Sequence, residues 1–147
     1  MNVRSVYLDT SALTKRYVVE DGSAGVDELY EEAHSGKIEI GFSIWNVGEA
    51  AAVLDKYERR GVIKNAKATF TKFIGETRLL AKLNQLKLTL LNLRILIEAA
   101  GYVFKHGIYV ADAVQLASAK GFDAFLTYDR KLAEIAKTEG LKTVEVH

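Results

Sequence analysis

The sequence contains no cysteine and no proline, and it carries almost no net charge. Without cysteine, disulfides, a thiolate zinc site and a cysteine nucleophile are all excluded, which is consistent with a reducing, cytoplasmic location. Lys and Arg number 20 against 19 Asp and Glu, so no overall positive field indicates nucleic acid, and any such contact must come from a local patch.

Long apolar runs are missing as well. The first residues lack the apolar core of a secretory signal. The most apolar stretch, 88–104, is interrupted by Asn92, Arg94 and Glu98, and it therefore predicts a strand and a buried helix rather than a membrane span. We expect a protein that is located in the cytoplasm and does not enter a membrane.

Several familiar catalytic motifs are absent too. There is no P-loop, no dinucleotide-binding G-x-G-x-x-G and no G-x-S-x-G nucleophile elbow. His34 and His106 fall at expected helix ends and His147 is the last residue, so we expect all three at the surface and none as a catalytic base. Carboxylates are then the main source of chemistry.

Strand patterns alternate with helix patterns along the chain. Its 147 residues, 49% of them hydrophobic, suit a single domain, residues 1–147, with a substantial core. The pattern predicts an α/β fold, a three-layer α/β/α sandwich around a mainly parallel five-stranded sheet. The expected strands are 3–8, 38–42, 87–91, 124–127 and 142–146, and the expected helices are 11–19, 23–35, 43–60, 65–85, 93–105, 109–120 and 130–139.

Three apolar segments each contain a single charged residue, and each time it is an acid. Asp9 is the only charge within 5–14, Glu49 within 40–54 and Asp112 within 107–119. An ionised carboxylate that is buried without a partner costs several kcal/mol, so each acid must reach solvent, a partner or a metal. Asp129 follows the strand 124–127 much as Asp9 follows the strand 3–8, and residues beyond the carboxyl ends of parallel strands share one crevice.

Each acid also has a simpler interpretation. Asp9 and Asp129 suit helix N-caps, and Asp112 suits the first turn of a helix, where the dipole favours negative charge. Glu49 could point to solvent beside Trp45 and Lys56. The coincidence of four such acids favours a shared cation, and carboxylates without His or Cys suit Mg²⁺ or Mn²⁺ rather than zinc. Such metals commonly act on phosphate esters.

The sequence at these positions resembles the PIN domain family, and most nearly the VapC-type toxins of toxin–antitoxin pairs. The resemblance lies in the segment LDTSAL at 8–13, in Glu49, in VADAVQLA at 110–117 and in LTYD at 126–129. It implies a Mg²⁺- or Mn²⁺-dependent ribonuclease that is a homodimer and has a VapB-type antitoxin partner. The implied catalytic and metal-binding residues are Asp9, Glu49, Asp112 and Asp129, with Ser11 and Thr127 as supporting polar residues.

These observations lead to the hypothesis of an endoribonuclease that uses the acids and their metal to hydrolyse RNA phosphodiester bonds. Four cations that follow the strand-end acids are candidates to guide the RNA backbone, namely Lys15, Arg16, Arg130 and Lys131. One alternative is a catalytically inactive PIN-like or receiver-like interaction module with the same fold. A phosphatase of the haloacid dehalogenase type is disfavoured, because its second Asp would fall at Ser11.

Overall fold

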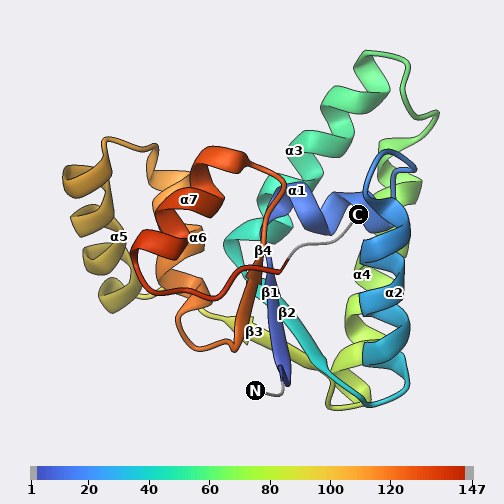
Figure 1. Cartoon of the computed structure of the whole chain (residues 1–147). Coiled ribbons are helices and arrows are strands. Elements are labelled where there is room, and N and C mark those ends of the chain that lie inside the picture. Colours follow the sequence, from blue (N-terminus) through green and yellow to red (C-terminus); the bar gives the residue numbers. More distant parts are fainter. Residues whose placement is uncertain (1–2, 145–147) are drawn as a thin grey trace.

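Four parallel strands form the central sheet of the computed structural model, which describes residues 3–144 (Figure 1). They are β1 (Ser5–Leu8), β2 (Glu39–Ser43), β3 (Leu86–Thr89) and β4 (Ala124–Leu126), in the order β3-β2-β1-β4. Every neighbouring pair is parallel, so all four carboxyl ends lie at one edge of the sheet. Strands β1 and β4 are buried along their whole length, as expected for a parallel sheet that is covered on both faces.

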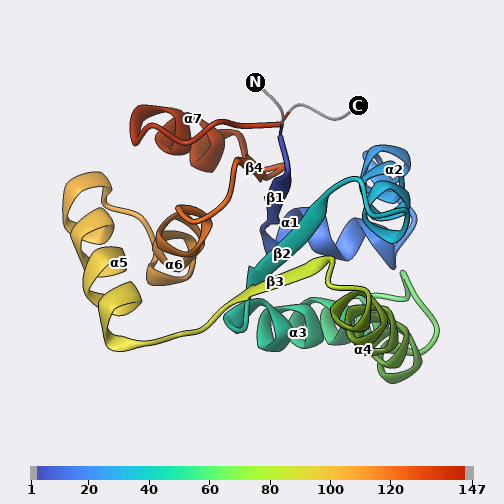
Figure 2. The same ribbon diagram turned by 90° about the horizontal axis from the view of Figure 1, so that it is seen from below.

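Helices cover both faces of this sheet. Figure 2 shows α5, α6 and α7 on one face and α2, α3 and α4 on the other. Helices α3 and α4 pack against each other. The helices are α1 (Thr10–Leu13), continued by the short 3₁₀ helix η1 (Thr14–Arg16), then α2 (Ser23–His34), α3 (Trp45–Arg59), α4 (Ala66–Lys82), α5 (Leu93–His106), α6 (Val110–Ala119) and α7 (Arg130–Thr138).

The α/β class and the parallel sheet are confirmed, but the prediction of five strands is wrong for the described residues. Within the predicted last strand, Thr143 forms only an isolated parallel bridge with Phe125. Two backbone hydrogen bonds support it, from Phe125 N to Lys142 O and from Val144 N to Phe125 O. Strand β4 is three residues long and offers a fifth strand little to pair with, and residues 145–146 of the prediction lie outside the described part.

The helix predicted to be buried, α5, is buried along one side only. Ile95, Ala99 and Tyr102 face the core, whereas Leu93 and Ile97 are exposed. The stretch 88–104 contains the end of β3 and most of α5, as predicted, but its sequence did not reveal the second apolar side of the helix. Among residues 3–144, no helix combines the length and the apolar character that crossing a membrane requires.

A polar cluster ties α4 to α2 and η1. The guanidinium of Arg16 donates to both carboxylate oxygens of Glu76, at 2.9 and 2.8 Å, and to Asp27 at 2.9 Å. His34 lies 2.9 Å from Glu76, while His106 lies 2.7 Å from Glu139. The two histidines, which were predicted to lie at the surface, are partly exposed and partly enclosed beside these acids; His147 lies outside the described residues. The side chain of Arg16 therefore stabilises the fold through these contacts.

Candidate active site at the carboxyl ends of the strands

Asp9 begins the site, one residue after β1. Its carboxylate is almost completely buried, with 4% of the residue exposed. One oxygen, Oδ1, accepts hydrogen bonds from the Ser11 hydroxyl at 2.6 Å and the Ala12 amide at 3.0 Å, so Asp9 also caps α1. The other oxygen, Oδ2, accepts a short hydrogen bond from Thr127 Oγ1. Both oxygens are therefore fixed in position by neutral donors.

This environment is costly for a charged carboxylate. Burial raises the pKa of Asp9 to about 6, although the hydrogen bonds from Ser11, Thr127 and Ala12 act in the opposite direction. The negative charge of Asp129 raises the pKa further. Within the described part of the chain, no Lys or Arg forms an ion pair with Asp9, Glu49, Asp112 or Asp129.

The end of β4 repeats the arrangement at the end of β1. Asp129 caps α7 by accepting from the Leu132 amide at 3.1 Å, and its own amide donates to Thr127 Oγ1 at 3.1 Å. Thr127 thus contacts both strand-end acids. Ser11 Oγ also accepts from the Tyr128 amide at 3.0 Å, which joins the two loops. The simple capping interpretation is correct for both acids, and the caps bring them to the same edge of the sheet.

Glu49 reaches this edge from the middle of α3. Its Oε1 accepts from Thr10 Oγ1 at 2.7 Å and from Gln115 Nε2 at 3.2 Å. Burial raises the pKa of Glu49, and the charge of Asp112 raises it further. Glu49 is half-buried and lies near Trp45, as the alternative interpretation expected, but these two hydrogen bonds direct its carboxylate toward α1 and α6.

Asp112 lies in the first turn of α6, as the simpler interpretation expected. Partial burial raises the pKa of Asp112, the charge of Asp129 adds to the effect, and Lys131 opposes it. The charge of Asp129 thus raises the pKa of both Asp9 and Asp112, while the charge of Asp112 raises the pKa of Glu49. The structure therefore brings the four predicted acids, which come from four separate segments, into one electrostatically coupled region.

Sequence reasoning missed the residues that hold Glu49. Gln115 is 3% exposed; it accepts from the Tyr7 hydroxyl at 2.6 Å and donates to Asn46 Oδ1 at 2.8 Å as well as to Glu49. Asn46 in turn donates to the carbonyl of Leu8 at 3.0 Å. Gln115 is the one amide side chain in α6, which is a visible signal, but it has no charge and does not stand out among isolated charges in apolar segments.

The donor set has the chemistry of a Mg²⁺ or Mn²⁺ site. All of its ligands would be oxygens, which hard divalent cations prefer. The charge of Asp129 raises the pKa values of Asp9 and Asp112, and the charge of Asp112 raises that of Glu49, without an ion-paired cation to balance them. As the side chains stand in residues 3–144, no three His, Asp or Glu side chains are grouped closely enough to hold one ion. The donor types and the charge therefore fit such a cation, and the number of ligands it would take is not fixed by this arrangement.

Two hollows flank the acids. One, of about 400 Å³, lies between α1 and α3 and includes Thr10, Lys15, Glu49 and Tyr57 in its lining. The other, of about 210 Å³, lies between α6 and α7. It is lined by two of the acids and one cation among mainly apolar residues: Gly107, Ile108, Tyr109, Asp112, Asp129, Lys131, Leu132 and Ile135.

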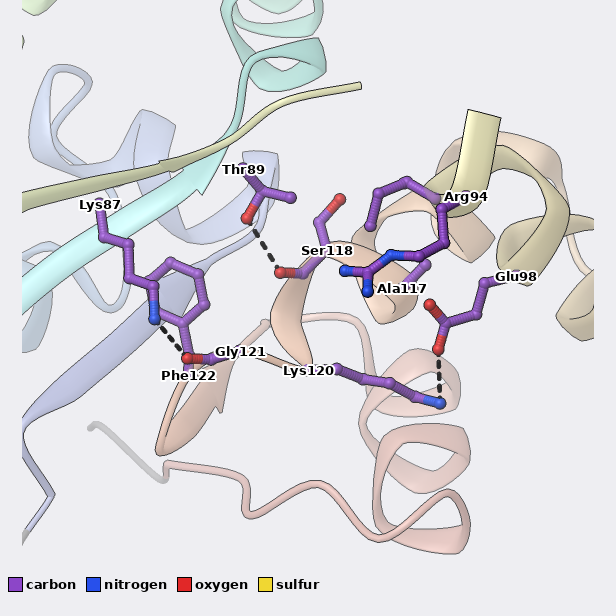
Figure 3. Close-up of a pocket in the computed structure, with 10 residues that line it drawn as sticks. Lys87, Thr89, Arg94, Glu98, Ala117, Ser118, Lys120, Gly121 and Phe122 are labelled. Atoms are coloured by element: carbon purple, nitrogen blue, oxygen red, sulfur yellow. Dashed lines mark hydrogen bonds and ion pairs between the residues drawn. The ribbon is translucent and has the colours of Figure 1, made fainter. Parts of the chain in front are cut away.

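A third hollow, of about 400 Å³, lies at the opposite end of α6 and contains none of the four acids (Figure 3). Two of its cations already have partners within the chain. Lys87 donates to the carbonyl of Gly121, just beyond α6, and Lys120 pairs with Glu98 at 2.6 Å. Thr89 Oγ1 also donates to the carbonyl of Ser118 in the last turn of α6, at 3.0 Å. These contacts join β3 and α5 to the carboxyl end of α6, so we interpret this hollow as structural.

Comparisons with known proteins place the fold. The family model described as PIN domain matches residues 6–138, whereas no curated protein matches the sequence. Three solved structures are similar in fold. The chain is 13% identical to VapC20 of Mycobacterium tuberculosis, described as a sarcin-ricin loop cleaving toxin, with a TM-score of 0.65 over 88% of this chain and 94% of that one.

The second structure is VapBC2 from Rickettsia felis bound to a DNA fragment from its promoter. It has 14% identity and a TM-score of 0.62, and the match covers 97% of this chain and 99% of that one. The third is a domain of a functionally unknown protein from Methanocaldococcus jannaschii, with 17% identity, a TM-score of 0.51 and coverage of 98% and 91%.

Proposed function

The chain belongs to the PIN domain family, and we propose that it is a metal-dependent endoribonuclease and the toxin of a type II toxin–antitoxin pair. The observation that carries this proposal is the coupling of Asp9, Glu49, Asp112 and Asp129 at one edge of the sheet without an ion-paired cation. Like charges in such a place are stabilised by a divalent cation, and this kind of site suits phosphodiester hydrolysis.

In this proposal the four acids hold one or two Mg²⁺ or Mn²⁺ ions. When bound, the cation supplies an activated water and neutralises the charge that develops at phosphorus. The chain's own task is to present the carboxylates. Ser11, Ala12 and Thr127 fix both oxygens of Asp9, and Thr10 and Gln115 orient Glu49. Such rigid support is what places a reacting phosphate accurately.

The similar structures support the choice of substrate and partner. The M. tuberculosis toxin is described as cleaving the sarcin-ricin loop, and the R. felis structure is a VapBC pair on DNA. By analogy we propose RNA as the substrate, a VapB-type antitoxin as the partner, the cytoplasm as the location and a single PIN-like domain spanning residues 1–147.

We also propose a homodimer, with the exposed side of α5 as the contact. Leu93, Ile97 and Phe104 are exposed there, and Phe104 is 87% exposed. Gly101 lies in the same row, four residues after Ile97, and its missing side chain leaves room for close approach of a second α5. An exposed apolar row of this kind favours protein contact over a free surface.

The direct test is cleavage of a labelled single-stranded RNA by the purified protein with Mn²⁺ or Mg²⁺. We expect cleavage that excess EDTA abolishes and that Asp9→Asn reduces by at least about 100-fold, roughly the loss of 2.7 kcal/mol of transition-state stabilisation. Undiminished cleavage under either condition would contradict the metal-dependent mechanism. Calorimetry with Mn²⁺ distinguishes the alternative, because an inactive interaction module has no reason to bind the ion.

A further inference from the structure

An exposed tyrosine stands beside the acids. Tyr109 is 84% exposed and lies between the last residue of α5 and the first of α6, three positions before Asp112. A ring so exposed adds little to the stability of the fold. It nevertheless lines the hollow between α6 and α7, together with Asp112 and Asp129.

The lining of this hollow has two chemically different parts. Ile108, Leu132 and Ile135 make an apolar wall, whereas the two acids and Lys131 make a charged one. Its volume of about 210 Å³ is below the ~300–1,000 Å³ of pockets for drug-sized ligands, so it suits a fragment of a larger molecule. A nucleotide likewise has a flat, largely apolar part and a charged part, namely a base that stacks on aromatic rings and a phosphate.

Lys131 is the cation in the lining of this hollow. It lies in the first turn of α7 and is exposed, and its positive charge acts to lower the pKa of Asp112. Across the site, Lys15 is paired with Glu20 at 3.2 Å and lies over the ring of Tyr128. No ion pair of Lys131 occurs within residues 3–144, so its amine remains free to meet a phosphate.

We propose that the hollow between α6 and α7 binds one nucleotide of single-stranded RNA next to the phosphate that is cleaved. The ring of Tyr109 stacks on the base, and the amine of Lys131 contacts the backbone phosphate. Stacking on a protein ring requires an unpaired base, so this subsite selects single strands over duplexes. The proposal rests on the proposed ribonuclease function and adds a binding site to it.

The test is the affinity for a fluorescein-labelled single-stranded RNA, measured by anisotropy with Mn²⁺ in the Asp9→Asn background so that the RNA stays intact. We expect Tyr109→Leu to weaken binding about tenfold, whereas Tyr109→Phe and Tyr109→Trp stay within about twofold, because base–aromatic stacking is worth ~1–3 kcal/mol. Affinity for a duplex of the same sequence should not change. Position 109 is exposed, and thermal melts verify that all variants are folded.

A matched pair on α7 tests the phosphate contact. Lys131→Gln should weaken binding and lower the slope of log affinity against log salt by about 0.7, the value for one contact to a single-stranded phosphate. Lys137→Gln, on the same helix but outside the hollow, should leave both quantities unchanged. Equal effects from the two variants would show only a general electrostatic attraction and would overturn the assigned contact.

The outcomes separate this inference from the proposed function. If the wild type cleaves RNA and Tyr109→Leu, in the wild-type background, binds and cleaves equally well, the subsite is wrong and the ribonuclease stands. If RNA binding depends on Tyr109 but the wild type cleaves nothing, the subsite stands and the ribonuclease fails. If the wild type binds no RNA, both fail. A Tyr109→Leu variant that changes only self-association in sedimentation would assign the ring to a protein contact and overturn the subsite.

Discussion

Two aspartates at opposite ends of β4 show how much a residue's position decides its role. Asp129 follows the strand and lies among the acids, whereas Asp123 precedes it and accepts from the backbone amides of Arg4 at 2.7 Å and Ser5 at 3.1 Å. These bonds lower the pKa of Asp123. The one acid therefore faces the candidate site, and the other holds the amino end of β1 beside β4.

This contrast gives a matched pair of variants. We expect Asp129→Asn to lower RNA cleavage by at least about tenfold, which corresponds to 1.4 kcal/mol, while Asp123→Asn retains activity and melts at a lower temperature. Initial rates and thermal melts of both variants under identical conditions provide the check. Equal losses of activity would mean that the active site has been assigned to the wrong ends of the strands.

The four acids stand out in the sequence, and the family resemblance also singles out Ser11 and Thr127, which donate to Asp9, but the supports of Glu49 were not predicted. A single charge in an apolar segment is visible without a structure, as at Glu49 and Asp112. The hydrogen bonds from Thr10 and Gln115 to Glu49 join residues 39 and 66 positions apart. Because hydroxyl and amide side chains have many possible partners, spacing along the chain does not reveal which one they contact.

At the scale of elements, helix and strand positions were largely predictable, since many helix ends have a local signal. Gly107, for example, ends α5 in the left-handed conformation that glycine adopts easily. The prediction of a fifth strand was wrong because a strand forms only beside a partner strand that is distant in the sequence, and its partner, β4, is short. The exposure of one side of α5 was not predicted either, because the sequence does not distinguish an exposed apolar residue from one that faces the core.

The exposed side of α5 leads to a test of the proposed homodimer. We expect Ile97→Glu to convert the protein to a monomer, because a dimer would have to bury the new charge without a partner. Sedimentation velocity across a concentration series provides the measurement. Leu79→Glu is the matched control, since Leu79 is an exposed leucine on α4, on the other face of the sheet, and it should leave the association state unchanged. A dimeric Ile97→Glu protein would locate the contact elsewhere.

For the whole molecule, the coupled acids connect stability to pH and to metal. The pKa values of Asp9, Glu49 and Asp112 are raised in the folded state, to about 6 for Asp9, so the folded protein holds more protons than the unfolded chain in this range. The stability gained from those protons is present below the unfolded carboxylate values near 4 and is lost as pH rises to about 6. Above this window the loss levels off, and a cation that binds only the folded state restores stability.

Asp112→Asn removes one of these like charges with little change in shape. In EDTA at pH 7 we expect it to stabilise the protein by up to about 1 kcal/mol, a small value because Asp112 is partly exposed and solvent screens its charge. The gain in melting temperature on adding Mn²⁺ should be smaller than in the wild type. Melts of both proteins with EDTA and with Mn²⁺ provide the measurement. A variant that melts lower in EDTA and gains as much from Mn²⁺ would show Asp112 to be only a helix-turn acid.

The order β3-β2-β1-β4 has a consequence for synthesis of the protein. Strand β1 is an interior strand, and one of its two neighbours, β4, follows it in the sequence only after β2 and β3. Asp9 receives its hydrogen bond from Thr127 only after 118 further residues have been added. A growing chain that has not yet reached β4 and Asp129 therefore lacks the assembled acids. If they cleave RNA, the ribosome that makes this protein is spared their activity until that point of translation.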